Sequence, residues 1–130
     1  MSFDLRKGTP NMTTNAVNEN SLFAIGFYGK IRYLRPAGCF VLGPPDYYSA
    51  VAWPFGSKGI TQGDRVGVSI PEYGSIWEGD EINSGGYEVQ VSLSQGLEDL
   101  DEACTNIDRI SALSQPEVGF SPNNLGPAVS

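Results

Sequence analysis

Four carboxylates fall within ten residues of a chain that contains no histidine. Two acids at a suitable separation can hydrolyse a glycosidic bond, and several carboxylate oxygens can bind Ca²⁺. The order of these acids lacks the alternating Asp or Asn and the distant Glu of a calcium loop. We therefore expect a solvated acidic turn that keeps a sheet edge from pairing, and a carboxylate-based hydrolase is the last of three functional hypotheses. The four residues are Glu72, Glu78, Asp80 and Glu81.

The two cysteines are the other reactive side chains, and their spacing matches no known site. Cys39 and Cys104 are 65 positions apart, which fits neither a zinc nor a redox motif. Without histidine there is no His-based catalytic triad and no His ligand for a metal. No glycine pattern matches a phosphate-binding or dinucleotide loop. We predict no cofactor and no metal. Buried free thiols are the expected state of both cysteines, and a disulfide that closes a long loop is the alternative.

Aromatic residues give a stronger signal than the reactive groups. Nine of the fourteen aromatics lie between Phe23 and Phe55. Several must be core, but the prolines in Pro44-Pro45-Asp46 and in the segment 53–56 place some rings beside loops. Tyr and Trp at loop edges are typical of interfaces and pockets. The predicted binding residues are Tyr47, Tyr48, Trp53, Phe55, Trp77, Arg32 and Arg35.

These rings support two functional hypotheses. In the first, the protein is not catalytic, and it self-associates or binds a protein partner through the surface 44–56. In the alternative, Tyr47, Tyr48, Trp53 and Trp77 line a pocket between sheet and helix for a small apolar or sugar-like molecule. Arg32 and Arg35 either guide an anionic group or pair with acidic residues.

Charge is distributed unevenly along the chain. The net charge of −7 argues against nucleic acid as a partner. Residues 1–65 carry seven of the eight basic residues and four acids, whereas residues 66–130 carry Arg109 and eleven acids. Ends of opposite sign would help copies dock. No apolar signal core or membrane-spanning run is visible, so we expect no signal peptide, no membrane contact, and a cytoplasmic protein or part of an assembled particle.

Glycine and proline divide the chain into short pieces that favour β structure. Residues 1–20 are polar and predict a flexible arm, residues 21–115 a single β-rich domain, and residues 116–130 an irregular tail. Strands are expected at 39–43, 48–53, 65–70 and 87–94, and the segment 83–86, Asn-Ser-Gly-Gly, predicts a turn.

The spacing of apolar residues changes after residue 96. Steps of three and four predict one amphipathic helix over 96–114 that covers the sheet. The expected fold class is therefore α+β: a mostly antiparallel β-sandwich or partial β-barrel of about six or seven short strands, with one C-terminal helix. The apolar stripe consists of Leu97, Leu100, Cys104, Ile107 and Ile110.

Overall fold

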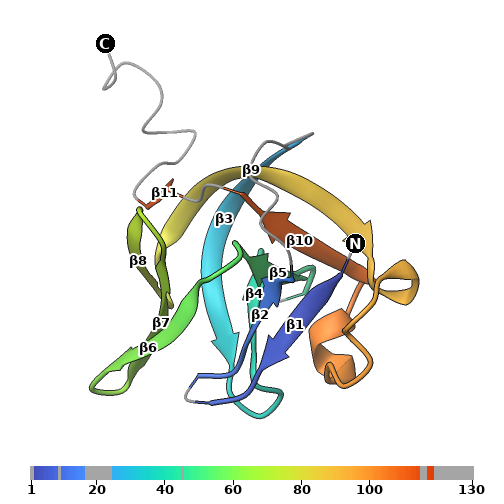
Figure 1. Ribbon diagram of the computed structural model, residues 1–130, viewed down its shortest axis with the longest axis horizontal. Helices are drawn as coiled ribbons and strands as arrows, with labels where there is room; N and C mark the ends of the chain where they lie inside the picture. The colour runs from blue at the N-terminus through green and yellow to red at the C-terminus, as the bar shows by residue number, and fades with distance from the viewer. Residues whose placement is uncertain (1, 9, 17–24, 45, 115–116, 119–130) are drawn as a thin grey trace.

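A computed structural model describes residues 2–8, 10–16, 25–44, 46–114 and 117–118. The chain is mostly β, with a closed five-stranded barrel, a second sheet and almost no helix (Figure 1). The β-rich, barrel-like part of the predicted fold is confirmed, and the C-terminal helix is not.

Five strands close the barrel in the order β5-β10-β9-β3-β4, and the circle is completed because β4 also pairs with β5. All of these pairings are antiparallel except that of β10 with β5. Closure leaves no free edge in the ring. The barrel strands are β3 (Ile25–Leu34), β4 (Cys39–Leu42), β5 (Ser49–Trp53), β9 (Glu81–Gln90) and β10 (Arg109–Leu113).

The segment expected to be a flexible arm instead adds two strands to this sheet. β1 (Phe3–Arg6) and β2 (Met12–Asn15) form an antiparallel pair, and β2 continues in parallel along β5. All four residues of β2 are buried, although Thr13, Thr14 and Asn15 are polar. Residues 17–20 of the expected arm lie outside the described residues. In the expected tail, β11 (Glu117–Val118) pairs with β9.

The second sheet is a three-stranded antiparallel meander of β6 (Lys58–Gln62), β7 (Arg65–Ile70) and β8 (Gly74–Trp77). It lies beside the barrel, on the side away from the loop that precedes β10 (Figure 1). β7 matches the predicted strand, and its alternating Val66, Val68 and Ile70 are buried. They join the main core, which we call the inner cluster: Met12, Phe27, Ile31, Phe40, Leu42, Val51, Trp53, Val66, Val68, Ile70, Ile76, Ile82 and Leu113.

A second set of buried side chains lies on the other face of β4, β5 and β10. Along β5, Val51 and Trp53 belong to the inner cluster, whereas Ala50 and Ala52 belong to this outer cluster. Both faces of β5 are therefore covered, as in strands buried at the centre of a fold. The outer cluster consists of Phe3, Cys39, Val41, Ala50, Ala52, Leu97, Cys104, Ile110 and Ala112.

The predicted helix over 96–114 is wrong. Residues 91–108, which we call the outer loop, contain only the 3₁₀ turns Val91–Leu93 and Glu102–Thr105, and strand β10 follows. Within this segment Gly96 and Asp108 have left-handed conformations, at φ +86° and +52°, which an α-helix cannot include. The apolar residues are still buried or half-buried, but through contacts with β4 and β5, so tertiary packing overrides the helical period.

The prediction of free thiols is also wrong, because Cys39 and Cys104 form a disulfide. Cys39 begins β4, and Cys104 lies fully buried in the second 3₁₀ turn. The bond therefore fastens the outer loop to the outer face of the barrel. Disulfides of this kind persist in oxidising surroundings.

Reduction of this disulfide is expected to lower the free energy of unfolding by up to about 4 kcal/mol, because it opens a 65-residue loop. Thermal unfolding with and without a reductant measures the effect. The double variant Cys39→Ser/Cys104→Ser is the control, and reductant should leave its Tm unchanged. The disulfide would be contradicted if the thiols of the native protein reacted with a thiol reagent. It would also be contradicted if the reductant left the Tm of the wild type unchanged.

Candidate functional site

The segment 44–56 is not one continuous surface. Its centre is β5, in which all five residues are buried. Tyr47 precedes the strand and is 67% exposed, while Phe55 follows it and is 44% exposed. A five-residue strand spans roughly 16 Å, so these two rings lie at opposite ends of a buried strand.

Two turns form the end of the molecule that carries Phe55. The amide of Ser57 donates to Pro54 O at 3.1 Å, and the amide of Tyr73 donates to Ile70 O at the same distance. A Cβ placed on Gly56 would lie 3.2 Å from Pro71 Cγ, so the two turns touch. We call Phe55, Pro71 and Tyr73 the ring tip.

The ring tip contains Phe55, which the sequence predicted as a binding residue, and Tyr73, which it did not. Tyr73 is 42% exposed, similar to Phe55. Its position two residues after Pro71 is the available signal, because the same reasoning selects Phe55 beside Pro54. The register that brings the two turns together was not visible in the sequence.

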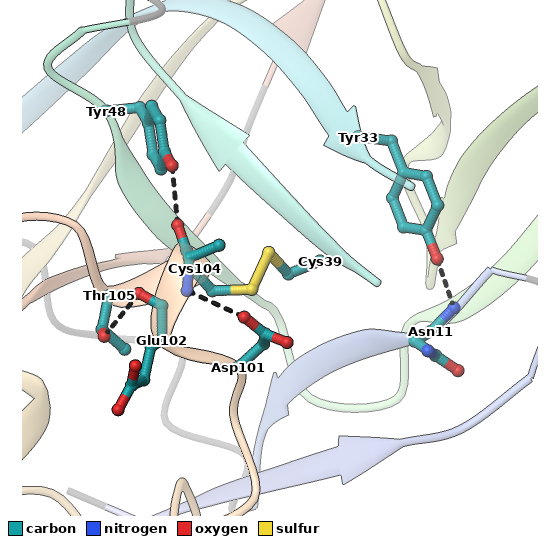
Figure 2. Close-up of a disulfide and its surroundings, with 9 residues drawn as sticks. Asn11, Tyr33, Cys39, Tyr48, Asp101, Glu102, Cys104 and Thr105 are labelled. Carbon is teal, nitrogen blue, oxygen red and sulfur yellow. Dashed lines mark hydrogen bonds between the residues drawn. A yellow bond between two sulfur atoms is a disulfide. The ribbon is translucent and has the colours of Figure 1, made fainter. Parts of the chain in front are cut away.

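Two of the predicted binding aromatics have structural contacts instead. Trp53 is fully buried, and its ring packs edge-on against Phe40 with centroids 5.5 Å apart. The Tyr48 hydroxyl donates to Ala103 O at 2.6 Å, beside the disulfide (Figure 2). Trp53 is therefore core in this structure, and Tyr48 holds the outer loop to the start of β5.

Trp77 and Arg35 belong to a network of charges between the barrel and the second sheet. Arg35 Nη1 donates to Glu78 Oε1 at 2.9 Å, and Arg35 Nη2 donates to Glu78 Oε2. Glu78 Oε2 also accepts from the Val66 amide at 3.0 Å. The guanidinium of Arg65 lies 5.5 Å from the centre of the Trp77 ring. Arg35 is thus engaged by an acidic residue, as one of the two sequence interpretations expected.

Two of the four carboxylates considered for hydrolysis, Glu78 and Asp80, also have structural partners. The hydrogen bond from Arg35 is the main reason that the pKa of Glu78 is lowered. Asp80 Oδ2 accepts from the Trp77 amide at 2.8 Å, and Asp80 Oδ1 lies 4.0 Å from Arg65. These bonds fix the turn between β8 and β9. Arg32, the other predicted basic residue, donates from Nε to Gly43 O at 3.2 Å.

Among the hollows formed by described residues are two that no aromatic side chain lines. The smaller, of about 60 Å³, lies between the outer loop and the β1–β2 hairpin and is lined by Asn11, Gly38 and Asp99, among others. The larger, of about 220 Å³, separates the β1–β2 turn from β6. The aromatic walls suggested for a pocket are thus distributed over the core, the outer loop and the second sheet.

Within the described ranges, no three potential metal-binding side chains gather, and no helix has the length and apolar character needed to cross a membrane. No family model, curated protein or solved structure matches the chain.

The substitution Glu78→Gln is expected to lower the Tm at neutral pH, because it removes an acceptor that holds Arg35 and the Val66 amide. Because the pKa of Glu78 in the folded state is below its ordinary value of 4.5, the charged carboxylate stabilises the fold at pH values above 4.5. This stabilisation is lost as the pH falls through the lowered pKa. The wild-type Tm should therefore fall more than that of the variant on acidification below pH 4.5.

Glu81→Gln is the matched control, because Glu81 is exposed and makes no ion pair with a described residue. It should leave both the Tm and its pH dependence close to wild type. A Glu78→Gln variant with the wild-type pH profile would show that this pair does not stabilise the junction.

Proposed function

We propose that the protein is a non-catalytic assembly subunit that self-associates head to tail. In this arrangement the ring tip of one copy contacts the turn from Pro44 to Tyr47 of the next copy. The observation that supports the proposal is the exposure of Phe55 and Tyr47 at opposite ends of β5. Exposed aromatic rings of this kind are frequent anchors at the centres of protein interfaces.

Two different exposed sites on one subunit suit heterologous contact. When unlike patches meet, the pair keeps one patch of each kind free, and the assembly closes into a ring or extends as a filament. A symmetric dimer would need only one patch. The first sequence hypothesis, self-association through aromatics, is therefore kept in a narrower form.

The strand between the two sites can transmit a fixed spacing. β5 pairs with β10 on one edge and with β4 and β2 on the other, and its side chains are buried on both faces. A strand held on every side is a rigid spacer, because its motion would disturb packed neighbours. Rigid presentation lowers the entropy lost on association.

The disulfide supports an assembled particle outside a reducing compartment as the place where the protein works. In such a setting the covalent bond would keep the outer loop in place without a partner. Of the two locations expected from the sequence, we propose the particle.

Sedimentation velocity over a range of concentrations tests the proposal. Wild-type protein is expected to form species larger than a monomer, and Phe55→Asp and Tyr47→Asp are each expected to remain monomeric. An equimolar mixture of these two variants should form dimers and nothing larger, because each supplies the intact site that the other lacks.

Leu93→Asp is the matched control, since Leu93 is an exposed apolar side chain elsewhere, at 76% exposure. This variant should assemble like the wild type. Association by Tyr47→Asp alone would show a symmetric contact between ring tips, and a monomeric wild type at every concentration would reject self-association.

A further inference from the structure

We propose that the larger hollow is a binding site for a phosphate group. It lies between the β1–β2 turn and the start of β6, and we call it the basic hollow. This inference stands apart from self-association, since it uses neither Phe55 nor Tyr47. The basic hollow is lined by Arg6, Lys7, Gly8, Pro10, Met12, Ser57, Lys58 and Gly59.

The floor of the basic hollow offers a hydroxyl group with no partner. Ser57 is fully buried, and its Oγ makes no hydrogen bond with any described residue. Most buried polar side-chain atoms are hydrogen-bonded, so each exception needs an explanation. The Oγ atom is itself enclosed, so a ligand oxygen in the basic hollow becomes its acceptor only when the Ser57 side chain or its neighbours shift to uncover it. Pro10 and Met12, also buried, supply the apolar part of the floor.

The rim carries three cations. Arg6, Lys7 and Lys58 are exposed, and none forms an ion pair with a described residue. By contrast, Arg35, Arg65 and Arg109 each pair with a carboxylate. In a chain of net charge −7, three unpaired cations around one hollow form a local positive field that attracts anions.

Nearby carboxylates compete only partly for these cations. Arg6 and Lys7 also line the smaller hollow, together with Asp99 and Asp101. No ion pair joins them, and the Asp101 carboxylate already accepts from the Ala103 amide at 2.8 Å. Asp99 should therefore weaken anion binding through distance-dependent repulsion without blocking the site.

The basic hollow is held open by backbone contacts. A Cβ on Gly59 would lie 3.0 Å from both Pro10 Cδ and Pro10 O, so β6 and the β1–β2 turn approach as closely as glycine allows. The Asn11 amide donates to the Tyr33 hydroxyl at 3.0 Å, which ties the turn to β3 (Figure 2). The Gly8 amide donates to Asn11 Oδ1 at 2.7 Å. The backbone of the site is therefore fixed before binding, whereas the exposed side chains of Arg6, Lys7 and Lys58 become ordered on binding.

Charge and hydrogen bonding favour phosphate over other anions. Three cations match the charge of about −1.5 to −2 that a phosphate monoester carries at neutral pH, and Arg can bind two of its oxygens at once. A volume of about 220 Å³ leaves room beside the phosphate for part of an attached group. The phosphate can therefore belong to the free ion or to a phosphorylated molecule.

Titration followed by amide NMR at constant ionic strength tests the inference, with inorganic phosphate, O-phosphoserine and acetate as probes. Saturable shifts are expected at Ser57, Lys58 and Gly59 with the two phosphates. Tighter binding of O-phosphoserine would identify a monoester as the ligand, and tighter binding of inorganic phosphate would identify the free ion. Shifts that do not saturate, or equal affinity for acetate, would overturn the proposal.

Charge variants locate the binding. Lys58→Gln and Arg6→Gln should each weaken phosphate binding by about tenfold, as the loss of one charge-assisted hydrogen bond predicts, while Asp99→Asn should strengthen it. Lys30→Gln is the matched control, because Lys30 is exposed on β3 and lies outside the basic hollow. Equal effects of Lys30→Gln and Lys58→Gln, with unchanged Tm in both, would show general charge attraction only and reject the site.

Discussion

The fold depends on the burial of β5 on all sides. Its short sequence, Ser-Ala-Val-Ala-Trp, places small alanines on the outer face, where the backbone of the outer loop must approach, and Val51 and Trp53 on the inner face. Its two edges carry β10, β4 and β2, so nearly every backbone group of the strand has a partner in the sheet. If β5 were displaced, the barrel would open, β2 would lose its place, and the aromatic turns at the two ends of β5 would no longer have a fixed separation.

The outer loop solves a problem that this architecture creates. A barrel strand with apolar side chains on both faces must also be shielded from water on its outer face. An irregular, largely polar segment such as the outer loop shields that face only if further contacts hold it against the barrel. The Cys39–Cys104 disulfide, the Tyr48 hydrogen bond to Ala103 O, and the Phe3 amide bond to Gln95 O of 3.0 Å attach the loop at separate points. Covalent and polar contacts thus replace the large apolar face that a helix would have supplied.

Local patterns of apolar residues in the sequence predicted several of the strands correctly. Period-two alternation located Arg65–Ile70, and short apolar runs located the strands at Cys39 and Ser49. The turn expected at 83–86 lies inside β9, where Gly85 pairs opposite Gly26, because pairing with β3 makes an extended glycine favourable. The polar stretch at Met12 became a buried strand only because β5 offers it an edge. At the candidate site, proximity to proline predicted exposure for Tyr47 and Phe55, whereas Trp53 lies next to a proline yet points toward Phe40.

Folding brings opposite charges from the two halves of the sequence together at several places. Arg35 and Arg65 come from the basic half of the chain and pair with Glu78 and Asp80 from the acidic half. Arg6 and Lys7 share the smaller hollow with Asp99 and Asp101. Folding therefore brings the two halves together and neutralises much of the asymmetry at short range. Long-range attraction between opposite ends is then a weak force for assembly, and any head-to-tail contact must depend on the aromatic rings.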